Sequence, residues 1–371
     1  MKWSWQIGRI AGIDLKVHST FMLILIWVGF SALLSGGNLT AALTNVLLIL
    51  ALFMCVVMHE FGHALTARIF GIKTRDITLL PIGGVARLEE MPEDPLEELL
   101  VAAAGPAVNV VISAALFSAL LITGYFSQPL NLSMLTGNIW MQLLAANITL
   151  VFFNLIPAFP MDGGRVLRAI LASGMDYVKA TNLAANVGRG FAVLMGIAGF
   201  FLNPWLIATA LFVWSGAGAE ARTVQIKRDL NGLTARDALI SKFYQVEANQ
   251  SLESLFQLAM QTGQSHFPVV SNGVYLGIIS RNDLMKTMDR LGSRSPAYAA
   301  ISGEPGNISP ETPLKDVMMK FGTNRTLPVV ENRQLLGLVT PESVQHLIWY
   351  NQRMGNTRPR PPRENINPLL D

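Results

Sequence analysis

Long apolar runs fill one part of this sequence and are almost absent from the rest. Residues 19–220 of the 371-residue chain hold nearly all of them, whereas residues 221–371 have the composition of an ordinary soluble domain. Over the whole chain 51% of the residues are hydrophobic and 14% are charged, against about 25% charged in average soluble proteins. The sequence therefore predicts an α-helical polytopic membrane domain followed by a soluble α/β domain.

Six segments have the length and apolar character of membrane spans, which need roughly 20 residues each. They cover residues 19–36, 43–67, 103–126, 137–158, 187–202 and 204–219. Lys and Arg residues lie at the termini and in one alternating set of connections, and the opposite set (36–42, 127–136 and 202–204) has none. Basic connections stay in the cytoplasm. We therefore expect a multi-pass protein of the cell (inner) membrane with both termini cytoplasmic.

A polar stretch, residues 71–90, separates the second and third spans. Its pieces 77–80 and 84–88 have strand-forming composition and flank a turn that contains Pro81 and Gly83. Non-helical backbone at membrane depth is stable only where protein or a water-filled cavity covers it. We therefore expect a small β insertion in the membrane domain.

The second apolar segment contains three ionisable residues within five positions, His59, Glu60 and His63. Residues four apart share one face of a helix, so both imidazoles can reach a single metal ion. Glu60 points aside from that pair, where its carboxylate can take a proton from metal-bound water. Ionisable groups inside a span cost about 2.5 kcal/mol or more each and usually mark function. The motif predicts a zinc site with Glu60 as general base.

A catalytic zinc site typically has a third protein ligand. The metzincin continuation is absent, because Thr66 and Ile69 stand where Gly and His would be. Glu89 and Glu90 lie in a polar stretch typical of solvated surface. Asp162 ends the fourth apolar segment in an Asp-Gly-Gly sequence that, taken alone, usually marks a turn. Because the second and fourth spans both run toward the cytoplasm, Asp162 approaches the same membrane face as the histidines and is the better candidate.

These motifs resemble those of the site-2 protease family of intramembrane metalloproteases, over most of residues 1–220. The matching residues are His59, Glu60 and His63, then Pro81, Gly83 and Gly84, then Ala104, Gly105, Pro106 and Asn109, then Asn154, Pro157, Asp162, Gly163 and Gly164. Met161 stands where the family commonly has Leu, a similar apolar side chain.

The resemblance implies the roles of several residues. His59, His63 and Asp162 would bind one Zn²⁺, and Glu60 would act as general base. Asn154 would help to hold the substrate backbone, and the strands at 77–88 would pair with an unwound substrate. The implied substrate is a membrane protein with a transmembrane helix, cut in or near that helix.

A repeat with an offset of 60 residues marks the C-terminal part. Residues 267–270 match 327–330, and 276–280 match 336–340, each pair after an amphipathic helix. The pattern resembles tandem CBS (cystathionine beta-synthase) domains over about 230–350, a family that commonly binds adenine nucleotides. The family's ribose-contacting Asp matches Asp283 in the first repeat. The second repeat has Ser343 at the matching position, so at most one nucleotide site is complete. Alternatively, the repeats serve only as a dimerising or substrate-docking module.

The whole pattern predicts a membrane-embedded metalloprotease domain at 1–228, tandem CBS domains at 229–350 and a disordered tail at 351–371. The protein could pair as a homodimer through the repeats. Lys and Arg form no dense run, which gives nucleic-acid binding no support.

Two alternative functions remain open from the sequence. The first is a CBS-regulated transporter or channel in which intramembrane His, Glu and Asp residues line an ion path. That alternative treats the spacing of His59, Glu60 and His63 as coincidence. The second is a catalytically inactive relative that only binds membrane helices. The intact Glu60 counts against it, because a pure binder needs no general base.

Overall fold

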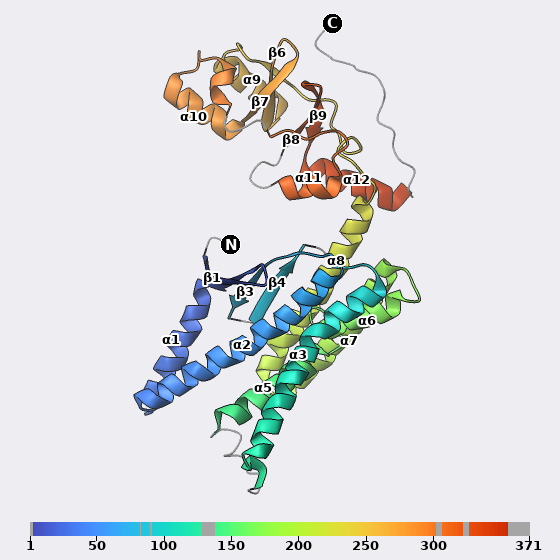
Figure 1. Ribbon diagram of the computed structural model, residues 1–371. Helices are drawn as coiled ribbons and strands as arrows, with labels where there is room; N and C mark the ends of the chain where they lie inside the picture. Colours follow the sequence, from blue (N-terminus) through green and yellow to red (C-terminus); the bar gives the residue numbers. More distant parts are fainter. Residues whose placement is uncertain are drawn as a thin grey trace. The chain divides into compact units, whose positions relative to one another are not determined.

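The computed structural model describes residues 3–81, 83–89, 91–127, 138–301, 306–321 and 326–354. The chain divides into two compact units, Met1–Val224 and Gln225–Asp371. Figure 1 shows that long helices dominate the first unit, whereas short helices and short strands alternate in the second.

The first unit contains the long helices. They are α1 (Ser19–Leu34), α2 (Leu39–Ile69), α3 (Pro95–Ile122), the short η1 (Tyr125–Ser127), α5 (Ile139–Asn154), α6 (Asp162–Ala172), α7 (Tyr177–Phe201) and α8 (Pro204–Leu230), whose residues from Gln225 onward belong to the second unit. Among the described residues, α2, α3 and α7 are long and apolar enough to cross a membrane. Helices α1 and α5 are apolar but have 16 residues each, about 24 Å of helix against a hydrocarbon core of about 30 Å. Length and composition alone therefore give three candidate spans where the sequence predicted six.

Side-chain caps explain where four of these helices begin. In each case the oxygen of an Asn or Asp side chain accepts hydrogen bonds from backbone N–H groups of the first turn, which otherwise have no partner in the helix. The capping residues are Asn38 for α2, Asp94 for α3, Asn138 for α5 and Asp176 for α7. Pro95 follows its cap directly, at a position where proline's missing N–H costs nothing.

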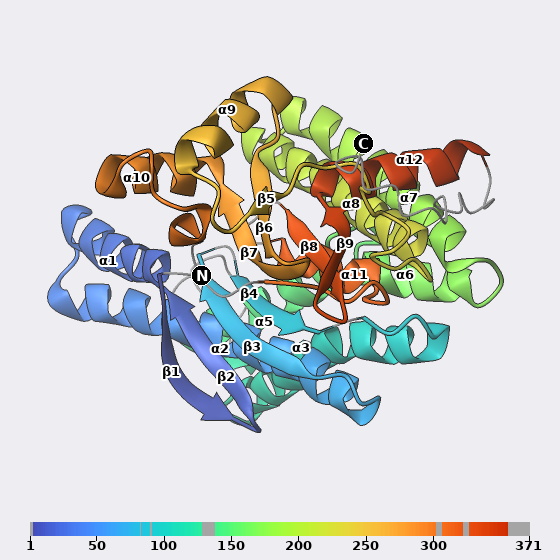
Figure 2. The ribbon, with the colours of Figure 1, turned by 90° about the horizontal axis from the view of Figure 1, so that it is seen from above.

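A four-stranded sheet in the order β1-β2-β3-β4 lies beside the helices of the first unit (Figure 2). Strands β3 (Thr74–Leu80) and β4 (Gly83–Leu88) confirm the predicted β insertion, and Ile82 between them lies outside the described residues. The hairpin of β1 (Ser4–Ile10) and β2 (Ile13–His18) was not predicted. Strand β2 pairs parallel with β3, and β4 forms one edge of the sheet.

The strand β2 has a clear signal that the sequence interpretation missed. Its residues Ile13, Leu15 and Val17 are buried and alternate with half-buried polar residues, the pattern of a strand with one face in the core. They pack with Val57 of α2 and Ile77 of β3 in one hydrophobic cluster. The hairpin therefore extends the sheet and ties it to the helix that carries the His-Glu-x-x-His motif.

The second unit contains both sequence repeats. Its elements are β5 (Val246–Glu247), α9 (Leu252–Thr262), β6 (His266–Ser271), β7 (Val274–Ser280), α10 (Arg281–Leu291), η2 (Ala297–Ala300), α11 (Leu314–Lys320), β8 (Leu327–Glu331), β9 (Gln334–Val339) and α12 (Pro341–Met354). The β6–β7 and β8–β9 pairs are antiparallel hairpins with the same register shift, and each is followed by a helix. The predicted repeat is therefore a repeat of structure.

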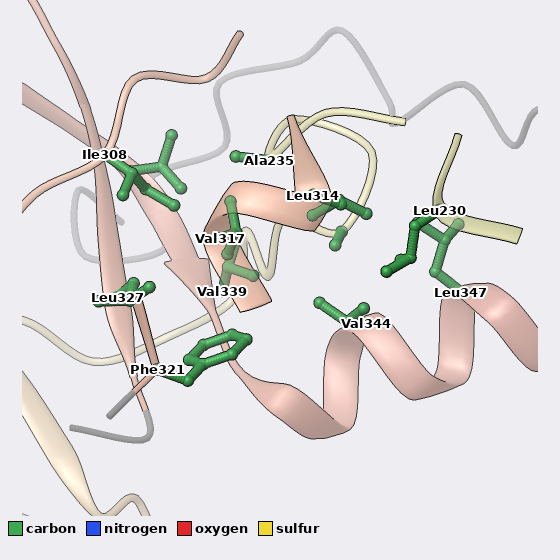
Figure 3. Close-up of a cluster of buried hydrophobic side chains, with 12 residues drawn as sticks. Leu230, Ala235, Ile308, Leu314, Val317, Phe321, Leu327, Val339, Val344 and Leu347 are labelled. Carbon is green, nitrogen blue, oxygen red and sulfur yellow. The ribbon is translucent and has the colours of Figure 1, made fainter. Parts of the chain in front are cut away.

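Each repeat has its own hydrophobic core. Figure 3 shows the core of the second repeat, where Val317 of α11, Val339 of β9 and Val344 of α12 lie around a common centre. Leu230, the last residue of α8, belongs to this cluster. Helix α12 runs to Met354, so residues 351–354 are helical rather than part of the predicted disordered tail. Residues 355–371 lie outside the described residues.

Candidate metal centre

Helix α2 presents two buried histidines on one face. His59 and His63 are 6% and 4% exposed, one helical turn apart, and their Nε2 atoms lie 3.1 Å from each other. The first residue of α6 completes the cluster. Asp162 is buried, and its Oδ2 atom lies 3.1 Å from His59 Nε2 and 3.2 Å from His63 Nε2. The structure thus brings together the three residues that the sequence singled out, from positions about 100 apart in the chain.

The hydrogen bonds of the two histidines indicate that the Nδ1 atom of each ring carries a proton. His59 Nδ1 lies 2.6 Å from Asn109 Oδ1, and His63 Nδ1 lies 2.7 Å from the Val101 carbonyl oxygen. Both partners accept hydrogen bonds, so each Nδ1 carries a proton, and the neutral imidazole then offers the lone pair of its Nε2. Lone pairs that face each other and a carboxylate oxygen at about 3 Å repel unless a cation lies among them.

These three donor atoms suit zinc. Nitrogen and oxygen ligands at about 2.0–2.1 Å in a tetrahedron lie about 3.3 Å from one another, close to the separations found between Asp162 and the two histidines. Two imidazoles and one carboxylate leave the fourth position open for water or substrate, the arrangement of catalytic zinc sites. Among the described residues this is the one cluster of at least three such ligands.

A glycine in α3 leaves the space that the ligands need. A Cβ atom added at Gly105 would lie 2.2 Å from His63 Nε2 and 2.7 Å from His59 Nε2, closer than real atoms approach. Helix α3 therefore packs its bare backbone against the donor atoms, a use of glycine that close approach requires. In the sequence analysis Gly105 is named only as part of a motif, and its role follows from the packing.

Two asparagines support the site from the Nδ1 side of His59, away from the donor atoms. The Asn109 side chain accepts from His59 Nδ1 and donates through Nδ2 to Asn147 Oδ1, 2.8 Å away. Asn147 in turn donates to the Leu143 carbonyl oxygen at 2.9 Å. Both amides are fully buried. The sequence interpretation did not single out Asn147, although a polar residue inside an apolar segment is itself a signal of function.

Replacing Asn109 with leucine is expected to weaken zinc binding by about 10–100-fold, the usual effect of losing the outer hydrogen bond of a metal-bound histidine. The imidazole of His59 would lose the acceptor that fixes its orientation and tautomer. Competition with a chromogenic chelator measures the affinity. Ser113→Ala, on the same helix, is the matched control. Equal zinc affinity in Asn109→Leu and the parent protein would contradict the supporting role.

Glycine residues allow the loop that leads to Asp162 to pack tightly. A Cβ atom at Gly163 would overlap the Ile156 carbonyl oxygen, and one at Gly164 would overlap the backbone nitrogen of Phe159. Gly188 of α7 and Gly216 of α8 likewise allow close packing against this loop, which contains a cis peptide bond before Pro160. The Asp-Gly-Gly sequence is therefore required by a tight fold-back of the chain between α5 and α6.

Glu60 lies under the edge strand β4. Its Oε2 accepts a hydrogen bond from the backbone N–H of Ala86 at 3.0 Å. A Cβ atom at Gly84 would lie 2.8 Å from Glu60 Cγ, so this glycine lets the strand cross directly over the carboxylate. The edge strand β4 and the acidic side chain beside the histidines are therefore in direct contact.

The structure places the remaining candidate residues as follows. Asn154 is half-buried at the last position of α5. Glu89 is exposed and forms an ion pair with Arg75, apart from the donor cluster, and Glu90 lies outside the described residues. Asp283 belongs to the second unit, where its backbone N–H donates to Ser280 Oγ and its carboxylate accepts from the same hydroxyl. This reciprocal pair caps the start of α10.

Comparison with known proteins identifies the family. The model of peptidase family M50 matches residues 47–195, and the CBS domain model matches residues 235–290 and 303–350. A zinc metalloprotease of Methanocaldococcus jannaschii is 32% identical over 345 residues, which cover 93% of this chain and 96% of the relative. The chain belongs to peptidase family M50, the site-2 proteases. A solved site-2 protease structure from the same organism is 38% identical over 59% of this chain and 95% of that one, with a TM-score of 0.43.

This site-2 protease is an intramembrane zinc metalloprotease with tandem CBS domains. Family membership, together with the donor cluster of α2 and α6, supports an enzyme over the two alternatives, a transporter and an inactive helix-binding protein. The chain is a membrane protein, and zinc is its metal.

Proposed function

We propose that this site-2 protease hydrolyses peptide bonds in or near transmembrane helices of membrane proteins, with His59, His63 and Asp162 as zinc ligands and Glu60 as general base. The observation that carries the proposal is the meeting of three buried donor atoms, with a carboxylate on the adjoining residue of α2. Bound Zn²⁺ supplies two kinds of chemistry, because it lowers the pKa of water toward about 7 and polarises a carbonyl group.

The chain's own contribution is the placement of a proton carrier. The hydrogen bond from the Ala86 N–H fixes one oxygen of the Glu60 carboxylate. The carboxylate then accepts the proton of the attacking water and passes it to the nitrogen of the leaving amide. A general acid–base group placed in this way typically contributes 10²–10⁴-fold in rate.

The outer edge of β4 is the proposed binding site for the substrate backbone. A helical substrate hides its peptide groups in its own hydrogen bonds, so it has to unwind before attack. The Ala86 N–H points away from β3, toward Glu60. Because N–H directions alternate along an antiparallel strand, the N–H groups of Gly84 and Leu88 also face outward. An extended substrate segment can add to this edge as a further strand.

Asn154 is proposed to hold the substrate backbone beside the zinc ion. Its place at the end of α5, next to the loop that leads to Asp162, supports that role. Asn154→Ala is expected to lower kcat/KM about tenfold, the effect of losing one or two hydrogen bonds, while zinc content stays at one ion per chain. Thr149→Ala on the same helix is the control. Unchanged cleavage by Asn154→Ala would remove Asn154 from substrate binding.

The proposed topology has six spans and both termini in the cytoplasm of a cell with an inner membrane. The division of Lys and Arg between alternate connections supports it. The proposed domains are the protease at 1–228 and the CBS pair from 229, with α12 continuing to Met354. Protease digestion of intact spheroplasts that express tagged protein tests the topology. Loss of either terminal tag from intact spheroplasts would contradict it.

Adenine nucleotide is the proposed ligand of the CBS pair, at the first repeat, with Asp283 as a contact. Titration of the full chain with ATP and AMP is expected to give a heat of binding that Asp283→Asn weakens about tenfold, because Asn keeps the cap of α10 but loses the charge. Ser343→Ala serves as the control. No heat at millimolar nucleotide would favour the alternative, a module for homodimer formation or substrate docking.

A single experiment tests the proposed function. Purified protein in detergent is expected to hold one zinc ion per chain and to cut a model peptide that contains a transmembrane segment. A chelator is expected to stop cleavage, and added Zn²⁺ to restore it. Metal-loaded protein that moves ions across vesicles but cuts nothing would favour the transporter.

A further inference from the structure

A second buried ionic cluster lies in the first unit, apart from the zinc ligands. Arg168 of α6 is fully buried, and so is Glu98 of α3. The guanidinium donates to Glu98 Oε1 through Nε at 2.8 Å and through Nη2. Its Nη1 donates to Glu220 Oε1 of α8 at 2.6 Å. Three helices are therefore joined through one arginine.

Two aromatic rings enclose the same guanidinium. The Arg168 carbon Cζ lies 5.0 Å from the ring centre of Phe159 and 5.0 Å from that of Tyr177. Phe159 belongs to the loop immediately before Asp162, and Tyr177 is the first residue of α7. Arg168 thus contacts the chain on both sides of Asp162, through Phe159 before it and Tyr177 after it.

Stability alone is a poor explanation for this cluster. Moving the Arg168 guanidinium and the Glu98 carboxylate out of water costs several kcal/mol per ion, and well-packed apolar residues often replace such groups without loss. Glu220 keeps part of its side chain exposed. A planar guanidinium with two carboxylate partners and two stacked rings has, however, only one geometry that satisfies all of its contacts. A buried ionic cluster of this kind fixes position more than it adds stability.

Asp162 needs such positional control. It is the first residue of α6, a helix of 11 residues, and it enters the zinc site from a loop rather than from a long helix such as α2. An error of about 1 Å in the placement of a catalytic group can cost 10²-fold in rate. Arg168 lies less than two helical turns further along the same helix, where its contacts hold the helix in both rotation and translation.

We propose that Arg168, clamped by Glu98 and Glu220, is a positioning residue for the zinc ligand Asp162. The proposal rests on the assignment of Asp162 as a ligand. It predicts that weakening the clamp changes the metal site of a protein that is still folded. Loss of Glu220 leaves Arg168 paired with Glu98, so Glu220→Gln perturbs the clamp without leaving an unpaired buried charge.

The test uses full-length Glu220→Gln and Arg168→Lys, with Glu97→Gln as the control beside Glu98. Zinc affinity is measured by chelator competition, the ligand geometry by the visible absorption spectrum of the Co²⁺-loaded protein, and folding by thermal unfolding. We expect about tenfold weaker zinc binding and a changed Co²⁺ spectrum in Glu220→Gln, larger changes in Arg168→Lys, and none in Glu97→Gln.

Two outcomes would overturn the proposal, and they differ. A lower unfolding temperature with unchanged zinc affinity and Co²⁺ spectrum in both clamp variants would show a purely structural role. Asp162→Asn is included as a reference. If it binds zinc as tightly as the parent protein, with the same Co²⁺ spectrum, then the ligand assignment fails as well, and with it the proposed zinc site.

Discussion

Glu60→Gln is expected to keep its zinc and lose about 10²–10⁴-fold of its cleavage rate, the contribution of a well-placed general base. The amide has the size of the carboxylate and can still accept the hydrogen bond from the Ala86 N–H, so β4 keeps its place. It has no proton affinity near neutral pH, so it cannot carry the proton from water to the leaving nitrogen. Metal analysis and cleavage of a transmembrane model peptide measure the two effects.

Glu89→Gln is the matched control for this variant. Glu89 is an exposed carboxylate at the end of the same β insertion, and its ion pair with Arg75 lies outside the donor cluster. It is expected to cut at the parental rate. Substantial turnover by a folded, zinc-loaded Glu60→Gln protein would remove Glu60 from the mechanism. The inactive variant also offers a trap for natural substrates, which proteomic analysis of bound partners can identify.

Gly105→Ala is expected to weaken zinc binding strongly although it adds only one methyl group. The new Cβ atom would lie 2.2 Å from His63 Nε2. The imidazole cannot easily turn away, because its Nδ1 is hydrogen-bonded to the Val101 carbonyl oxygen. We expect zinc affinity to fall by at least about 100-fold, more than the loss of an outer hydrogen bond causes, with cleavage falling in step.

Gly190→Ala provides the matched control, because a Cβ atom added there meets nothing within 4 Å. Alanine in place of glycine inside a helix usually stabilises by about 0.5–1 kcal/mol, so this variant is expected to bind zinc and cut normally. Zinc content and chelator competition decide the comparison. Unchanged zinc affinity in Gly105→Ala would mean that α3 does not pack against the donor atoms as the structure has it.

The local part of the site could be predicted from the sequence. The spacing of His59 and His63 places both imidazoles on one helical face, because helical periodicity depends only on the chain itself. The apolar runs indicated a membrane domain, and the repeat at an offset of 60 indicated two similar C-terminal units. The hairpin β1–β2 also has a local signal, the alternation of Ile13, Leu15 and Val17, which the sequence interpretation overlooked.

Long-range contacts had to come from the tertiary structure. The sequence could place Asp162 near the correct membrane face, but only the packing of α6 against α3, which itself packs against α2, brings the Asp162 Oδ2 to about 3 Å from both histidines. The packing of the helices also explains why position 105 requires glycine. It gives Arg168 its two carboxylate partners. Such contacts join residues from separate helices, and no periodicity within one segment encodes the distance between two segments. Local sequence patterns thus predict the types of the ligand residues and the membrane setting, whereas the fold provides the geometry that lets these residues hold one ion.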